Sequence, residues 1–142
     1  MRVLLDTDVI LDFVLEREPY LEAAAELMDL NARATYQGFV SSLTPINVFY
    51  VGRKAVGATK ARQRISDLLV ALEVCPVTHL TLSTALNLPF RDYEDAVQHS
   101  SALAGGLDAI VTRNVKDYKN ATLPIFTPVD FLQHLKSEKD QT

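Results

Sequence analysis

The chain has 142 residues, of which 48% are hydrophobic and 23% are charged, and its net charge at pH 7 is −4. This composition excludes a disordered chain and provides enough apolar side chains for a compact core. The negative net charge argues against a protein that coats nucleic acid through bulk positive charge, whereas local basic patches and bound cations stay compatible with nucleic acid.

Signals for membrane insertion, secretion and disulfide formation are missing from the sequence. No apolar run reaches the roughly 18 residues that span a bilayer, and the first residues lack the pattern of a signal peptide. The single cysteine, Cys75, is expected to be a reduced core residue. We therefore expect a cytoplasmic protein without contact to a membrane. The three histidines are far apart in the sequence, so a zinc site has little support.

The first predicted element is a strand over residues 2–5 (RVLL), an apolar run typical of a strand buried on both faces. From Val9 onward the apolar residues fall at helical spacing, and Asp8 is predicted to cap this helix. The next predicted elements are an amphipathic helix over residues 20–34 and a strand over residues 38–42.

The following elements continue the alternation. Residues 44–56 are predicted as a helix with Thr44 as its cap and Pro45 in its first turn. Gly105 and Gly106 are predicted to end a later helix. The remaining predicted elements are helices over residues 59–73, 79–88, 92–104 and 128–137, and strands over residues 73–77, 108–112 and 124–126. This alternation predicts one domain over residues 1–142, a three-layer α/β/α sandwich around a mostly parallel sheet.

Polar side chains follow the ends of several predicted strands. In parallel sheets, ligands bind beyond the carboxyl ends of the strands. Asp6 comes directly after the first strand, where a structural role is hardest to assign and a functional one is favoured. The other residues expected at this edge are Asn47, Asp92, Asp95, Thr112, Asn114 and Asp117.

Convergence of Asp6, Asp95 and Asp117 would need positive charge or protons, because burying an uncompensated carboxylate costs several kcal/mol. A set of oxygen ligands without Cys or His suits Mg²⁺ or Mn²⁺. Two such ions about 4 Å apart can activate a water and stabilise the leaving oxygen of a phosphodiester. The residues therefore favour metal-dependent phosphoryl hydrolysis.

Each further acidic residue also has a structural interpretation. Asp8 is better explained as an N-cap than as a ligand. Asp12, one helical turn later, is expected to face solvent or to support the site indirectly. Asp92 is equally suited to capping its helix and to reaching a metal. Asp95 could complete a capping box, and Asp117 could be an ordinary loop residue.

Four segments resemble the PIN domain family: VLLDTDVILD at the start, VSSLTPINVFY near residue 45, DYEDAVQHSSA near residue 95 and AIVTRNVKDYK near residue 115. The family includes the VapC-like toxins of toxin–antitoxin pairs and RNA-processing nucleases. The resemblance implies an α/β/α sandwich with an acidic Mg²⁺ or Mn²⁺ site that cleaves RNA. It also implies a homodimer and a small antitoxin protein that holds the toxin inactive.

By this resemblance, Asp6, Asp95 and Asp117 are the catalytic acids. Thr112 and Asn114 match the Thr-x-Asp/Asn turn of the family and are expected to support the site.

The departure from the family pattern is at Asn47, because many relatives carry Glu three residues after the threonine that corresponds to Thr44. An amide brings no charge, so metal binding should be weaker. Asp92 is hypothesised to supply the missing charge as a further metal ligand. Under this hypothesis, Asp92→Ala lowers metal affinity about as much as Asp95→Ala.

Basic residues suggest where RNA would bind. Arg113 and Lys116 interleave with the acidic turn and are placed to steer phosphate. Tyr93 and Tyr118 are better explained by packing than by stacking on a base. The densest basic stretch offers either a phosphate-contacting rim or a solvated helix face. It comprises Arg53, Lys54, Lys60, Arg62 and Arg64.

Two alternatives to a nuclease are open at this stage. Haloacid dehalogenase-like phosphatases also begin with an apolar strand and D-x-D, in which Asp6 would be the nucleophile. The later segment GGLDAIVT does not supply their acidic pair well. With Asn47 in place of a carboxylate, the chain could also be a catalytically weak module that binds RNA or protein. Catalysis is the favoured interpretation.

Overall fold

The computed structural model describes residues 1–141, and its centre is a five-stranded sheet in the order β3-β2-β1-β4-β5. All pairings between these strands are parallel, so the sheet predicted as mostly parallel is wholly parallel. The strands are β1 (Arg2–Leu5), β2 (Gln37–Ser41), β3 (Glu73–Cys75), β4 (Ala109–Val111) and β5 (Ile125–Phe126).

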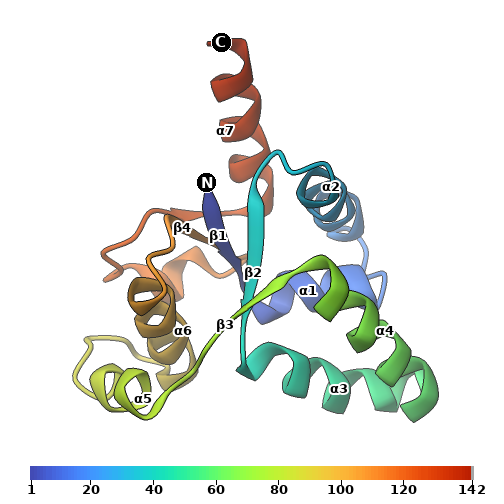
Figure 1. Ribbon diagram of the computed structural model, residues 1–142, viewed down its shortest axis with the longest axis horizontal. Helices are drawn as coiled ribbons and strands as arrows, with labels where there is room; N and C mark the ends of the chain where they lie inside the picture. Colours follow the sequence, from blue (N-terminus) through green and yellow to red (C-terminus); the bar gives the residue numbers. More distant parts are fainter. Residues whose placement is uncertain (142) are drawn as a thin grey trace.

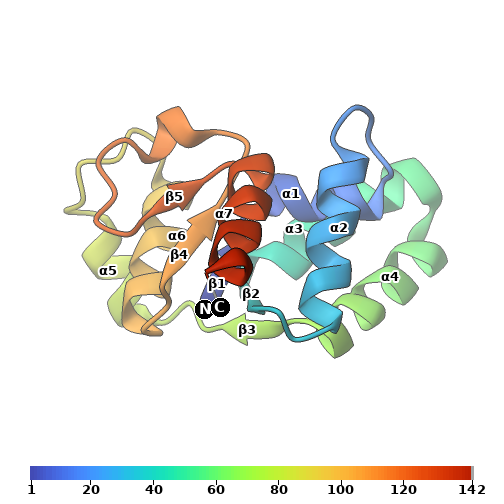
Figure 2. The same ribbon diagram turned by 90° about the horizontal axis from the view of Figure 1, so that it is seen from above.

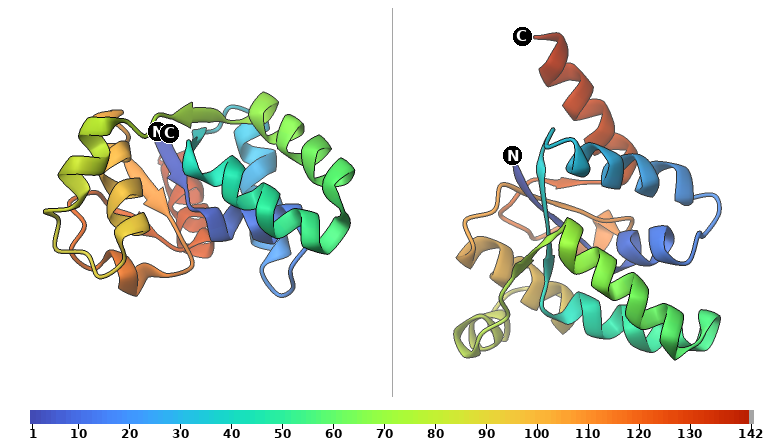
Figure 3. Two further views of the ribbon diagram at one scale, coloured as in Figure 1. Left: turned by 90° about the horizontal axis from the view of Figure 1, so that it is seen from below. Right: turned by 45° about the vertical axis from the view of Figure 1, so that its right-hand side comes forward.

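Helices connect the strands and cover both faces of the sheet. They are α1 (Thr7–Val14), α2 (Leu21–Ala32), α3 (Leu43–Val56), α4 (Ala58–Ala71), α5 (His79–Ala85), α6 (Tyr93–Ala104), α7 (Pro128–Asp140) and the short 3₁₀-helix η1 (Val115–Tyr118), which the sequence analysis did not predict. Helices α1 to α4 lie on one side of the sheet, and α5 and α6 lie on the other (Figures 1 and 2). The predicted three-layer α/β/α sandwich is therefore confirmed. The end of α7 projects from the body (Figure 3).

The central strand β1 is buried on both faces, as its apolar sequence predicts. Val3, Leu4 and Leu5 are all 0% exposed. Because successive side chains of a strand point to opposite faces, Val3 and Leu5 pack in the core beneath α1 to α4 and α7, whereas Leu4 packs in the core on the side of α6. The middle strand of the sheet is thus enclosed by core side chains on both faces.

Two predicted helix caps are wrong. Helix α1 begins at Thr7 rather than near Val9, and its N-cap is Asp6, whose backbone is extended and whose side chain accepts from the Thr7 N–H at 2.8 Å. Asp8 already lies in the first turn and so cannot cap. Helix α3 begins one residue before Thr44, and the Thr44 hydroxyl instead lies 2.9 Å from the Thr7 hydroxyl.

The end of α6 confirms the predicted glycine stop. Gly106 has a φ of 67°, the left-handed conformation that favours glycine. The single cysteine, Cys75, is buried as expected. In the described part of the chain, no helix is long and apolar enough to cross a membrane. That all 142 residues fold as one domain stays a prediction.

The pairing of β1 with β4 determines which residues meet at the carboxyl edge of the sheet. Leu5 is aligned with Val111, and the Asp6 N–H donates to the Val111 carbonyl at 2.9 Å. The next residue on each strand is therefore Asp6 on one side and Thr112 on the other. The register places an acid beside a hydroxyl at the point where the sequence analysis expects a site.

Candidate functional site

Asp6 is a buried carboxylate, 6% exposed, whose two oxygens are held by three donors. Its Oδ1 accepts from the Thr7 N–H and from the Gln98 side-chain amide, and its Oδ2 accepts from the Thr112 hydroxyl at 2.8 Å. Burial raises the pKa of Asp6, and these hydrogen bonds oppose the rise. A carboxylate offers about four lone-pair positions, so the three donors leave about one for a ligand.

Asp8 follows Asp6 by two residues, and its side chain is held by a residue of the turn after β4. The Asn114 side-chain amide donates to Asp8 Oδ2 at 2.9 Å, while Asp8 Oδ1 is buried without a hydrogen-bond partner. Burial and then the charge of Asp6 raise the pKa of Asp8 to about 7, and the charge of Arg113 opposes this rise. Asp8 therefore carries an unsatisfied acceptor within the acidic region.

Asp95 is presented by the first turn of α6. The Asp92 side chain caps this helix and accepts from the Asp95 N–H at 3.1 Å, which confirms the capping interpretation of Asp92. Burial, followed by the charges of Asp6, Asp92 and Asp117, raises the pKa of Asp95 to about 7. Asp6 and Asp117, the two acids expected to converge with Asp95, are thus among the charges that act on it, and their binding of a shared ion stays a prediction.

The turn after β4 supplies the remaining predicted residues. The Asn114 N–H donates to the Thr112 hydroxyl at 3.0 Å, and the Asp117 N–H donates to the Asn114 carbonyl at 2.9 Å. Asp117 is exposed on η1. Tyr118, the next residue, is buried, and its hydroxyl lies 3.4 Å from Asp95 Oδ1. The packing role expected for Tyr118 is confirmed, and its contact with an acid is new.

Glu94 is a carboxylate that the sequence analysis did not select. The Asn47 side-chain amide, from the first turns of α3, donates to Glu94 Oε1 at 2.8 Å. Burial and the charges of Asp92 and Asp6 raise the pKa of Glu94. No sequence spacing connects positions 47 and 94, so only the placement of two helices reveals this pair.

Gln98 was also missed, although a signal was present. It follows Asp95 by three residues, and this spacing places both side chains on one face of α6. Gln98 is 1% exposed, its amide nitrogen donates to Asp6, and its Oε1 is buried without a hydrogen-bond partner. A buried acceptor without a partner is costly, so this oxygen marks a place where a ligand would be favourable.

The donors in this acidic region fit a hard cation. Within residues 1–141, no three carboxylate, imidazole or thiol side chains are grouped so that they could hold a metal ion together. Mg²⁺, however, is commonly bound through one or two carboxylates and several waters. The partnerless oxygens of Asp8 and Gln98 and the repulsion that acts on Asp95 are the features that such an ion would relieve.

Arg113 and Lys116, two of the basic residues expected to contact RNA, differ from each other in their surroundings. Arg113 pairs with Asp12 and lies 3.9 Å from the centre of the Tyr20 ring. Asp12 is 1% exposed, so of its two expected roles the solvent-facing one is wrong, and the indirect support of the site is the one that is left. Lys116 is exposed on η1, next to Asp117.

The basic residues of α3 lie at the exposed end of that helix. Arg53 stacks on the Tyr50 ring at 5.0 Å, and Lys54 is exposed. Their predicted contact with RNA stays a prediction.

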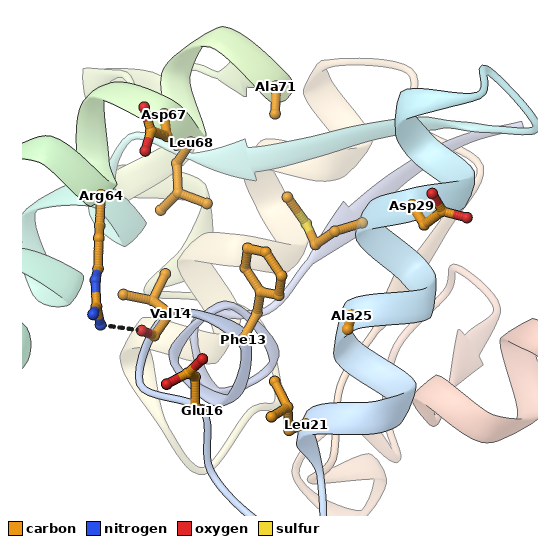
Figure 4. A pocket seen from close by; sticks show the side chains of 11 residues that line it. Phe13, Val14, Glu16, Leu21, Ala25, Asp29, Arg64, Asp67, Leu68 and Ala71 are labelled. Atoms are coloured by element: carbon orange, nitrogen blue, oxygen red, sulfur yellow. Dashed lines mark hydrogen bonds between the residues drawn. The ribbon is translucent and has the colours of Figure 1, made fainter.

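A separate groove of about 710 Å³ lies between α1, α2 and α4 (Figure 4). Its floor is apolar and includes Phe13, Met28 and Leu68. Its edges carry the acidic Glu16, Asp29 and Asp67 and the basic Arg64, so they are mainly acidic. None of the acids of the sheet edge described above lines this groove. It is a surface suited to covering by another molecule rather than to chemistry.

Several solved structures share this fold. VapBC2 from Rickettsia felis, solved with a DNA fragment from its promoter, has a TM-score of 0.71 and 16% identity and covers 89% of this chain and 98% of its own. DNA-bound VapBC from Salmonella typhimurium has a TM-score of 0.70 and 20% identity, covering 90% and 98%. VapC20 from Mycobacterium tuberculosis, a toxin that cleaves the sarcin-ricin loop, has a TM-score of 0.61 and 13% identity, covering 76% and 86%.

Sequence comparison gives the family directly. A search of curated protein sequences finds no significant match. The sequence profile of the PIN domain, in contrast, matches residues 2–116, which include β1 and β4 and the site residues Asp6, Asp95 and Asn114 but not Asp117. This match gives no support to the phosphatase alternative. The chain belongs to the PIN domain family.

Proposed function

We propose that this chain is a divalent-cation-dependent endoribonuclease of the toxin type, which uses Mg²⁺ or Mn²⁺ to hydrolyse RNA phosphodiester bonds. The observation that carries the proposal is that two buried oxygens, Asp8 Oδ1 and Gln98 Oε1, have no hydrogen-bond partner where Gln98 contacts the Asp6 carboxylate at the carboxyl edge of a parallel sheet. Oxygens of this kind can bind a cation or a water that a cation holds. Membership of the PIN domain family and the fold shared with VapC proteins support it.

The residues of the site have distinct roles in this proposal. Asp6, Asp95 and Asp117 would bind the cation, with Asp92 as a further candidate ligand. Gln98 and Thr112 orient Asp6 through hydrogen bonds. Asn114 orients Asp8.

A bound Mg²⁺ or Mn²⁺ would supply activation of a water and stabilisation of the leaving oxygen. The protein contributes fixed positions for the acids and exposed positive charge for the RNA. Lys116 beside Asp117 would contact a phosphate, as would Arg53 and Lys54 in the last turn of α3.

The test is a cleavage assay on total RNA with Mg²⁺ or Mn²⁺ and with a chelator. Asp6→Asn keeps the size of the side chain but removes its charge, and it should abolish cleavage. Asp130→Asn, an exposed aspartate in the first turn of α7, is the matched control and should cleave normally. Cleavage that persists in Asp6→Asn or in the presence of the chelator would contradict the proposal.

A catalytically weak RNA-binding module is the second candidate. Two observations favour it: Asn47 stands where a carboxylate was expected, and residues 1–141 hold no preformed group of three metal-ligating side chains. This candidate predicts RNA binding that is independent of metal and unchanged in Asp6→Asn and Asn47→Glu. A gel-shift titration of labelled RNA with and without chelator separates it from the nuclease.

A small antitoxin protein is the partner that we propose for the groove between α1, α2 and α4. Its apolar floor and acidic edge suit an amphipathic segment with basic flanking residues. Met28→Glu should prevent assembly with such an antitoxin protein while leaving cation binding intact. Glu26→Gln, an exposed change on the same helix, is the control.

A homodimer and a cytoplasmic location stay predictions. Exposed apolar side chains on α3 support self-association, since Ile46 is 57% exposed and Tyr50 is 54% exposed. Light scattering of the purified chain measures the oligomeric state. Ile46→Lys should convert a dimer to a monomer if this face forms the interface.

A further inference from the structure

Two helices that enter the acidic edge from different strands are joined by one side-chain contact. Asn47 belongs to α3, which follows β2, and Glu94 belongs to the first turn of α6, which precedes β4. The Asn47 amide donates to Glu94 Oε1 at 2.8 Å. Since an amide donor holds one carboxylate oxygen, the other oxygen of Glu94 has a restricted direction and remains able to bind a cation.

Glu94 lies in the same helical turn as two acids of the site. It stands between Asp92, the N-cap of α6, and Asp95 in the chain, and its Oε1 accepts from Asn47. A carboxylate that is held beside neighbouring acids by a neutral amide is an arrangement that a cation would stabilise.

We propose that Glu94 is a cation-binding carboxylate of this site and that Asn47 is the residue that positions it. The inference rests on the proposed function, since it names a ligand of the same site. Many relatives carry a further acid on α3, at the position of Asn47. In this chain, the proposal assigns that acidic group to Glu94 on α6. The neutral residue at position 47 then has a role of its own, because it donates a hydrogen bond that a glutamate could not donate.

Gln98 provides an independent indication of a ligand here. It lies one helical turn after Glu94 on α6, its side chain is 1% exposed, and its amide nitrogen contacts Asp6. Its Oε1 is buried and without a partner. A neutral acceptor that is buried in an acidic region finds a partner in a cation or in a water bound to one.

Asp92 is the competing candidate for the additional charge. Its side chain caps α6 by accepting from the Asp95 N–H at 3.1 Å, so the end of the helix constrains it. Glu94 has its hydrogen bond from another helix and projects from the exposed part of the first turn. The geometry favours Glu94 over Asp92 as the ligand.

The experiment is a titration of the full chain with Mn²⁺, in which free Mn²⁺ is measured by electron paramagnetic resonance. Glu94→Gln retains shape and should raise the dissociation constant about tenfold. Asn47→Ala retains all charges and should raise it by less. The matched control Glu26→Gln should bind Mn²⁺ like the unmodified chain. Thermal unfolding of each variant without metal shows that it is folded.

A rescue variant separates the loss of the Glu94 charge from an effect of the substitution on folding. Asn47→Glu combined with Glu94→Gln returns one carboxylate to the same place from α3, and Mn²⁺ affinity should recover. Asp92→Ser keeps a preferred helix cap but removes the charge, and it should change affinity less than Glu94→Gln.

The outcomes distinguish this inference from the proposed function. If Asp6→Asn weakens Mn²⁺ binding and Glu94→Gln does not, the site stands and the role of Glu94 is overturned. If neither variant weakens binding, the metal site of the proposed function is overturned as well. If Glu94→Gln is not folded, Glu94→Asp takes its place, since a shorter acid keeps the charge but loses the contact with Asn47 and should also weaken binding.

Discussion

The guanidinium of Arg113 forms an ion pair with the buried carboxylate of Asp12, with 2.6 Å between Nε and Oδ2 and 3.3 Å between Nη2 and Oδ1. This pair joins α1 to the turn after β4, two segments that both carry acids of the site. Arg113 follows Thr112, and Asp12 lies one turn after Asp8. The ion pair therefore fixes α1 and the turn after β4 relative to each other.

Arg113→Ala should be a stability variant rather than an RNA-binding variant. It leaves the Asp12 carboxylate, 1% exposed, without its counter-charge, and removing one partner of a buried pair costs about 3–5 kcal/mol. Urea unfolding measures this loss. Lys116→Ala is the contrasting variant, because Lys116 is exposed on η1, and it should weaken RNA binding with little change in stability. Equal stability of the two variants would contradict the structural role of Arg113.

Thr112→Val should destabilise the fold by about 2 kcal/mol. The change keeps the shape of the side chain but removes the hydroxyl that donates to Asp6 Oδ2, and a hydrogen bond to a charged group contributes about 1.5–3 kcal/mol. Thr112→Ser keeps the donor and loses only a methyl, so it should cost less. The two are compared by denaturant unfolding at pH 8 in metal-free buffer. The interpretation fails if serine is the more damaging substitution.

Stability without metal should fall as the pH rises from 6 to 8. The pKa values of Asp8 and Asp95 in the folded chain are about 7, above the ordinary value of 3.8. Since their folded-state pKa is raised, the folded chain binds more protons than the unfolded chain between about pH 4 and pH 7. This contribution is complete below the ordinary pKa and is lost as the pH rises through 7.

The measurement is thermal unfolding in the presence of a chelator. The midpoint should be a few degrees lower at pH 8 than at pH 6, and Asp95→Asn should reduce this difference because its side chain has no charge to develop. Added Mn²⁺ should raise the midpoint at pH 8 in the unmodified chain. A midpoint that does not change between the two pH values would argue against repulsion among the acids.

Tyr118→Phe should raise the pKa of Asp95 still further. The Tyr118 hydroxyl lies 3.4 Å from Asp95 Oδ1 and lowers that pKa, whereas its ring packs edge-on against Phe90 and would be retained. Titration of the Asp95 carboxyl carbon by NMR without metal measures the effect. Tyr36→Phe is the matched control, because its buried hydroxyl donates to the Leu27 carbonyl of α2 and not to Asp95. It should leave the pKa of Asp95 unchanged.

The sequence allowed the sheet and the edge of the site to be predicted because both depend on short-range patterns. An apolar run of four residues predicts β1, and parallel pairing brings the residue after one strand beside the residue after its neighbour. Asp6 and Thr112 follow from this rule. The helix cap was misplaced by two residues, since both Asp6 and Asp8 are good capping residues and only the extended backbone of Asp6 decides between them.

Contacts between helices could not be predicted in the same way. The contact of Asn47 with Glu94 depends on how the first turns of α3 and α6 approach each other across the sheet edge. The pairing of Asp12 with Arg113 likewise depends on the path of the chain after β4. Neither contact is encoded in a local spacing. The sequence therefore offered no reason to select Glu94, and it suggested a contact with RNA for Arg113 because Arg113 lies beside the acidic turn.

The three donors to Asp6 come from very different stages of synthesis. Thr7 is the next residue, but Gln98 follows 92 residues later and Thr112 follows 106 residues later. A growing polypeptide on the ribosome therefore exposes this aspartate for most of its translation without the groups that orient it. For the nuclease that we propose, this order means that the site can form only after Thr112 has been synthesised, so the antitoxin proposed above would have an interval in which to bind first.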